Sequence, residues 1–294
     1  MAQTIQLEEN GLYLVLKVTD EQDVRLLHFG TSPLDVKAIG EKQEEGFRLL
    51  ELQLSGDDRA EYHGRTHRAT FPGLRMRYAG HTDTRNGIGR KLEIAMTDPE
   101  TKLKSVSHLQ FYTGTSVVRA WTVLVNEGEE SVGVEYVSSF ALTGIDKEGK
   151  LDRDEKLRLS IPHTGWQSEI QWRTNTIPEL GLSHMTDRSS KRISCSNTGS
   201  WAAAEHIPMA VLENVEAGTS LVWQIEHNGS WHWEIIDQFD YLTLLVSGPT
   251  EHDNHWWKEL APGEEFVSVP VAVGAAKGGF EEAIGELTKY RRLI

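Results

Sequence analysis

The chain of 294 residues contains a single cysteine, Cys195. One thiol cannot form an internal disulfide, and disulfides are rare in reducing compartments. The fold therefore has to be stabilised by its core, and Cys195 is expected to be a small buried residue. The amino-terminal residues also lack the basic, apolar and small-residue zones of a signal peptide. Together these absences predict a cytoplasmic protein.

Basic residues are scarce relative to acidic ones. The chain has 30 Lys and Arg against 44 Asp and Glu, for a formal net charge of −14. Binding to nucleic-acid phosphates or to an anionic membrane surface needs a surplus of positive charge. No apolar run reaches the roughly 20 residues of a membrane helix. We therefore expect neither nucleic acid nor a membrane as a partner.

Motifs of cofactor and catalytic chemistry are also missing. There is no Gly-x-Ser-x-Gly elbow and no glycine loop of the kind that binds phosphate. The cluster His252, Asp253, His255 and the pair His63, His67 do not have the ligand spacing of a closed zinc site. No carboxylate pair stands out among the many acidic residues. The residues by themselves predict no metal, no cofactor and no catalytic group, and they favour ordinary polar histidines.

What the sequence does contain is a series of short apolar and β-branched runs separated by Gly, Pro, Asn and Asp. Strands at this spacing predict an all-β sandwich or barrel. The expected strands are residues 11–18, 47–54, 74–78, 91–96, 106–112, 117–125, 132–142, 156–161, 169–173, 209–212, 241–246 and 265–272.

Two hairpins are predicted from their turns. Residues 221–227 and 230–236 flank Asn228-Gly229, a pair that suits a type I′ turn because it tolerates positive φ. Residues 212–215 and 220–225 flank the short connection Glu216-Ala217-Gly218.

The last 16 residues predict a helix. Phe280, Ala283, Ile284 and Leu287 follow the i, i+3, i+4, i+7 pattern. Acidic residues occupy its first turn and basic residues its last, as the helix dipole favours. The expected organisation is a β domain over residues 1–278 and a helix over 279–294. A shorter, weaker helix signal covers 178–183, within the otherwise irregular stretch 174–206.

Nine tryptophans are many for this length, and six of them follow residue 200. Indole rings pack in cores and also stack on sugar rings. Trp223 and Trp233, on expected strands, are predicted to be packing residues. Trp201 lies in the irregular stretch, where binding residues tend to occur.

Several long blocks resemble glycoside hydrolase family 36, the bacterial-type α-galactosidases. They are GRKLEIAMTDPETKLKSVSHLQFY, VGVEYVSSFALTGID, NTGSWAAAEHIPMAVLEN, LVWQIEHNGSWHWEI, SGPTEHDNHWWKELAPGEEFVSVPVAVG and GGFEEAIGELTKYRR. The resemblance extends over about residues 8–292. It implies a large antiparallel β-supersandwich of two packed sheets with a C-terminal linker helix.

The same resemblance implies an accessory role. In that family the supersandwich is amino-terminal and precedes a (β/α)₈ barrel, which holds the catalytic aspartates and is absent here. The whole enzyme would be a retaining α-galactosidase acting on raffinose- or melibiose-type sugars. The expected partners are that barrel, α-galactoside sugars and further copies of the protein, in a tetramer. We therefore expect no catalytic residue, and no activity, in this chain alone.

Two segments are candidates for walling the sugar pocket. The first contains Asp57, Asp58, His63 and Arg65, whose charged groups suit recognition of sugar hydroxyls. The second is Trp201, as a stacking surface.

Three alternatives stay open: a stand-alone carbohydrate-binding module, a purely structural oligomerisation module, and an independent sugar-converting enzyme such as an aldose epimerase. The last needs a histidine and a carboxylate on facing strands, and nothing in the sequence selects such a pair.

Overall fold

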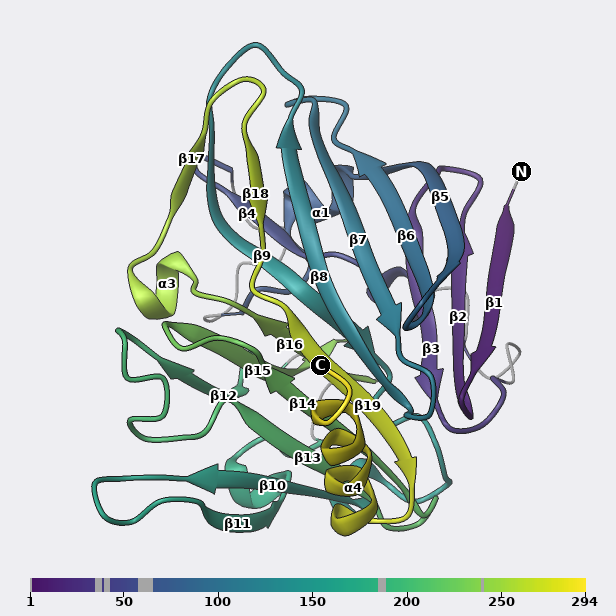
Figure 1. Cartoon of the computed structure of the whole chain (residues 1–294), viewed down its shortest axis with the longest axis vertical. Coiled ribbons are helices and arrows are strands. Elements are labelled where there is room, and N and C mark those ends of the chain that lie inside the picture. Colours follow the sequence, from purple (N-terminus) through teal and green to yellow (C-terminus); the bar gives the residue numbers. More distant parts are fainter. Residues whose placement is uncertain (1, 35–38, 40–42, 58–65, 185–188, 239–240) are drawn as a thin grey trace.

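The computed structural model describes residues 2–34, 39, 43–57, 66–184, 189–238 and 241–294. Strands dominate it, in two large sheets and one small one, and every strand pair among these residues is antiparallel (Figure 1). The predicted all-β sandwich is confirmed. No helix in the described part of the chain is both long and apolar enough to cross a membrane.

The largest sheet has ten strands. In spatial order they are β11 (Gln171–Thr176), β10 (Leu157–His163), β13 (Met209–Asn214), β14 (Thr219–Ile225), β19 (Val271–Lys277), β8 (Val117–Asn126), β7 (Leu103–Phe111), β6 (Gly89–Thr97) and β5 (Arg77–Asn86), with β18 (Glu265–Val267) also beside β8.

The second sheet has six strands. In spatial order they are β12 (Arg192–Asn197), β15 (Trp231–Gln238), β16 (Tyr241–Ser247), β9 (Val132–Thr143) and β17 (Lys258–Leu260), with β4 (Leu52–Leu54) also beside β9. A three-stranded sheet of β1 (Gln3–Glu9), β2 (Leu12–Val18) and β3 (Val24–Gly30) completes the strands. One continuous core contains side chains of all three sheets, among them Leu14, Leu124, Phe140, Trp223 and Trp233.

The helices are short except for the last. They are α1 (Phe71–Arg75), α2 (Arg153–Lys156), α3 (Glu251–Asn254) and α4 (Phe280–Arg291), with 3₁₀ turns at Gln43–Gly46 and Pro178–Leu180. The predicted C-terminal helix is confirmed as α4, which packs on β19, β14 and β13 (Figure 1). It buries Ala283, Leu287 and Tyr290. Its start is capped because the Gly279 N–H donates to the Glu282 carboxylate at 2.9 Å.

One of the two predicted hairpins is wrong. Strands β14 and β15 flank Asn228-Gly229, but β14 pairs with β13 and β19, whereas β15 pairs with β12 and β16. Neither turn residue has positive φ. The Asn-Gly pair therefore connects the two large sheets instead of turning within one. The other predicted hairpin is confirmed, since β13 pairs with β14 and Gly218 has a φ of 62°.

Three further predictions need correction. The strand expected over 74–78 begins only at Arg77, because Phe71–Arg75 form α1. Of the strand expected over 47–54, only β4 forms, and Phe47 and Leu49 contact β3 through single backbone hydrogen bonds to Leu26 and Val24. The stretch 174–206 is also less irregular than expected, because it contains β12, and its weak helix signal corresponds to the 3₁₀ turn at Pro178–Leu180.

We expect Gly89→Ala to destabilise the β5–β6 hairpin. A Cβ atom at Gly89 would lie 2.1 Å from the Phe111 carbonyl oxygen, so the backbone of one strand has to move. Overpacking of this kind costs about 1–3 kcal/mol. Chemical denaturation measures it, and Gly87→Ala, where no atom lies within 4 Å, is the matched control. Equal stability of the two variants would contradict the expectation.

Candidate functional site

The candidate site begins with the alternation of side chains on β15. Successive residues of a strand point to opposite faces, so His232 and Glu234 share one face, and Trp231 and Trp233 share the other. All four are buried. The strand thus places an imidazole and a carboxylate inside the protein, where unpaired polar groups are costly.

A second histidine comes from the segment just before α1. Glu51 holds this segment, because its carboxylate accepts hydrogen bonds from the Ala69 N–H at 2.7 Å and the Thr70 N–H at 3.0 Å. The Thr70 hydroxyl donates to the same carboxylate at 2.8 Å. Burial raises the pKa of Glu51, against the opposing effect of Arg48 and these hydrogen bonds. The anchored segment directs His67 into the interior.

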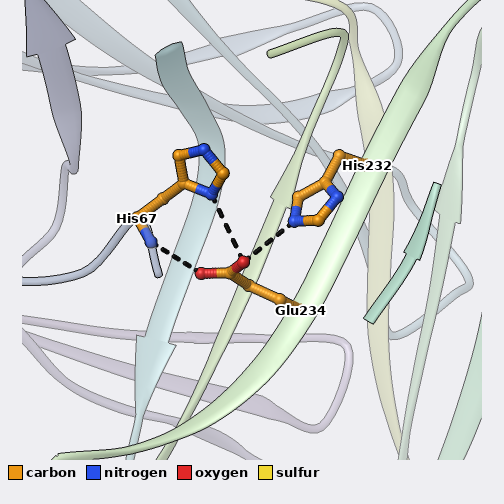
Figure 2. Close-up of side chains that lie close together, drawn as sticks. All are labelled: His67, His232 and Glu234. Carbon is orange, nitrogen blue, oxygen red and sulfur yellow. Dashed lines mark hydrogen bonds and ion pairs between the residues drawn. The ribbon is translucent and has the colours of Figure 1, made fainter. Parts of the chain in front are cut away.

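The three side chains meet at the Glu234 carboxylate (Figure 2). His67 Nδ1 lies 3.3 Å and His232 Nε2 lies 2.9 Å from Glu234 Oε2. The backbone N–H of His67 donates to Oε1 at 2.8 Å. The carboxylate therefore connects the segment before α1 to strand β15.

An arginine, Arg192, and a second carboxylate, Asp253, lie next to Glu234 and His232. Arg192, on β12, donates to Glu234 at 2.9 Å and to both oxygens of Asp253. Asp253 Oδ2 lies 3.5 Å from Nδ1 of His232. The ring of Tyr136 stacks on His67 with a centroid distance of 4.2 Å. Its hydroxyl is buried and has no hydrogen-bond partner among the described residues.

The charges keep Glu234 ionised. Burial alone would raise its pKa, but His67 and His232 lower it well below the usual range. The same burial raises the pKa of Tyr136 well above its usual range, with Glu234 and Glu51 adding to the effect. Chemically, the group can exchange protons between imidazole and carboxylate or hold a cation. A substrate-sized ligand cannot reach it in this conformation, because His67, His232 and Glu234 are at most 1% exposed.

The residues predicted from sequence lie elsewhere or outside the described part. Trp201 is 55% exposed and packs edge-on against Trp166, which is 79% exposed, with ring centroids 6.2 Å apart. Asp57 is paired with Arg75 at 2.8 Å. Asp58, His63 and Arg65 lie outside the described residues. The roles of these five residues stay predictions.

Other predictions about single residues are confirmed. Trp223 and Trp233 are fully buried, and so, nearly, is Cys195, whose thiol pKa burial raises to about 12.

The His67–Glu234–His232 group was not predicted. In the sequence His67 and Asp253 lie next to other histidines, His63 for the first and His252 and His255 for the second, whereas the structure joins both to β15. The available signal was the pattern His232-Trp233-Glu234, two polar residues that share one face of a strand and alternate with Trp231, Trp233 and Ile235.

The fold is a large β-supersandwich. The His67–Glu234–His232 group is buried inside it, with His232 and Glu234 on a strand of the six-stranded sheet. No protein-family model matches the chain. No curated protein sequence matches it either.

Solved structures do match. The glycoside hydrolase family 36 α-galactosidase AgaA from Geobacillus stearothermophilus superposes with a TM-score of 0.71 over 96% of this chain, at 15% identity. The α-galactosidase from Lactobacillus brevis gives 0.73 over 99% of this chain, at 10% identity. This chain spans only 42% of the length of each. The resemblance to family 36 is thus confirmed at the level of the fold.

A smaller protein has a related fold. A protein from Escherichia coli K12 described as an aldose 1-epimerase gives a TM-score of 0.54 at 12% identity. The match covers 94% of this chain and 100% of that one.

Proposed function

We propose that this chain is the amino-terminal accessory domain of a cytoplasmic, retaining α-galactosidase. The observation that carries the proposal is one of extent: nearly the whole chain matches less than half of each α-galactosidase. Its partner is then a catalytic (β/α)₈ barrel, and the substrates of the whole enzyme are raffinose- or melibiose-type sugars. The domain helps to wall the sugar pocket and to assemble a homo-oligomer, a tetramer.

The burial of the polar group supports an accessory role. General acid–base catalysis requires the catalytic groups to come within hydrogen-bond reach of the substrate. His67, His232 and Glu234 are sealed inside the sandwich. The catalytic carboxylates of a glycosidase have to flank the scissile bond, so Glu234 is not one of them, which agrees with a catalytic pair on another domain.

Hydrolysis of p-nitrophenyl α-galactoside tests the proposal. The 294-residue chain should be inactive, and a longer protein in which a catalytic barrel follows it should release p-nitrophenol. Activity of the 294-residue chain alone would contradict the accessory role, and inactivity of the folded longer protein would contradict the α-galactosidase assignment.

Trp201→Ala tests the sugar-wall role of the exposed tryptophan. In the barrel-containing protein we expect kcat/KM to fall about tenfold, equivalent to about 1.4 kcal/mol, because an exposed indole that stacks on the substrate is lost. Light scattering should show an unchanged oligomer. Trp257→Ala, another exposed tryptophan, is the matched control. Altered assembly with unchanged kinetics would instead favour the structural module.

A stand-alone carbohydrate-binding module is the alternative that the exposed Trp166–Trp201 pair favours. It predicts that galactose or raffinose binds the 294-residue chain itself. Titration calorimetry that shows binding in the native chain and none in Trp201→Ala would support it. The accessory role predicts no heat of binding for the isolated chain.

The match over the full length of the epimerase-like protein favours a second candidate function. An aldose epimerase would accelerate the interconversion of the α and β anomers of galactose. Polarimetry on freshly dissolved α-galactose measures this rate. Equal rates with and without the protein would eliminate this candidate, and a rate lost in Glu234→Gln would assign the chemistry to the buried group.

A further inference from the structure

We propose that His67, His232 and Glu234 form a zinc-binding site that ties the segment before α1 to strand β15. The potential ligand atoms of these three residues all lie within 4.8 Å of one another. They come from two parts of the chain, more than 160 residues apart, so that the fold alone brings them together (Figure 2).

The spacing suits a shared metal ion. Zn²⁺ lies about 2.0–2.2 Å from imidazole nitrogen and carboxylate oxygen, which separates two ligands of a tetrahedral site by about 3.4 Å. The two nitrogen-to-Oε2 distances here are 3.3 Å and 2.9 Å. An ion shared by the three atoms requires the two nitrogen-to-oxygen distances to lengthen by a few tenths of an ångström, and all three atoms already lie within 4.8 Å of one another. Two imidazoles and one carboxylate are a donor set that zinc accepts, with a fourth position left for water.

The surroundings also match a metal site. Metal-binding histidines commonly have their second ring nitrogen next to a carboxylate, which orients the ring. Asp253 Oδ2 occupies that position, 3.5 Å from His232 Nδ1. Arg192 in turn holds Asp253 in place through both of its oxygens.

The charge balance leaves room for a cation. Glu234 and Asp253 contribute two negative charges, and Arg192 contributes one positive charge. With neutral histidines, the buried group carries a net charge of −1. Charges inside a protein need compensation. A proton on one histidine brings the group to neutrality, whereas Zn²⁺ changes its net charge from −1 to +1. The positive charge of Arg192 weakens zinc binding, but its hydrogen bonds go to the carboxylates of Glu234 and Asp253 and leave the imidazole nitrogens to the metal.

Metal titration of the intact chain tests the site. After removal of metals with a chelator, we expect one equivalent of Zn²⁺ to bind and to raise the midpoint of thermal unfolding. Co²⁺ should give the visible absorption of a four-coordinate nitrogen–oxygen site. In ¹⁵N NMR spectra of the histidine rings, zinc should change the chemical shifts of His67 Nδ1 and His232 Nε2. This measurement is made on the native chain, so it does not depend on a variant that folds.

Variants locate the ion. His232→Gln should weaken zinc binding by more than about 100-fold, and Asp253→Asn, which leaves all three ligands in place, by about 10–100-fold. His255→Ala, an exposed histidine near Asp253, should leave the affinity unchanged. The proposal is overturned if no stoichiometric Zn²⁺ binds, if zinc shifts other histidines only, or if NMR shows a histidine of this group that stays protonated with zinc present.

Discussion

Glu234→Ala is expected to lower the free energy of unfolding by about 3–5 kcal/mol, the usual cost of removing one partner from a buried ion pair. The carboxylate is fully buried and accepts hydrogen bonds from His67, His232 and Arg192. Without it, the two histidines lose their carboxylate partner in the interior, Arg192 keeps only Asp253, and the segment before α1 loses this connection to β15.

Chemical denaturation followed by circular dichroism measures this loss. The matched control is Glu259→Ala, an exposed glutamate on β17 of the same sheet, which should change stability by no more than about 0.5 kcal/mol. A similar small change for both variants would mean that the polar group contributes little to stability, and that water replaces the carboxylate at no cost.

Glu234→Gln separates the charge from the shape. The folded-state pKa of Glu234 is lowered well below the ordinary glutamate value of 4.5 by His67 and His232. A depressed carboxyl pKa contributes stability that is present above the unfolded-state pKa and is lost as the pH falls through the folded-state pKa. The stability difference between native protein and Glu234→Gln should therefore be largest above pH 4.5 and narrow in more acidic solution. A difference that is independent of pH would contradict this assignment of the charge.

Trp223→Ala is expected to cost about 3–5 kcal/mol, as for other large-to-small changes in cores. Trp223 lies on β14 of the ten-stranded sheet, and Trp233 lies on β15 of the six-stranded sheet. Their rings meet edge to face with centroids 5.3 Å apart, and both are fully buried. The pair therefore connects the two large sheets across the core, and an alanine would leave a cavity between them.

Two comparisons sharpen this prediction. Trp257→Ala, at an exposed position, should be nearly neutral. Trp223→Phe should lose less stability than Trp223→Ala, because it keeps much of the ring and removes an indole N–H that is buried with no hydrogen-bond partner in the described part of the chain. If the three variants unfold at the same denaturant concentration, the sheets do not depend on this contact.

The elements with strong local patterns could be predicted from the sequence. The alternation of apolar and polar residues indicated most strands because a half-buried strand needs it. The 3.6-residue period of apolar residues and the acidic-to-basic order of charges predicted α4, because a helix that packs on a sheet buries one face. The segments that resemble glycoside hydrolase family 36 predicted the β-supersandwich, and the similarity to solved α-galactosidase structures confirms this fold.

Pairing between strands could not be predicted in the same way. Asn228-Gly229 has the composition of a tight hairpin turn, yet β14 and β15 belong to different sheets. A turn sequence reports only local backbone preference. Which neighbour a strand pairs with is decided by burial, and here burial places Trp223 and Trp233 on opposite sides of the core, with their rings edge to face, rather than side by side in one sheet.

The buried polar group shows the same division. The sequence by itself determined most of the strands, β15 among them, and the C-terminal helix, because each depends on residues close together in the chain. Only the tertiary structure decided that His67 and Asp253 meet His232 and Glu234 of β15. Their meeting depends on long-range packing of the segment before α1 and of α3 against one sheet, and no local propensity encodes the distance between such segments.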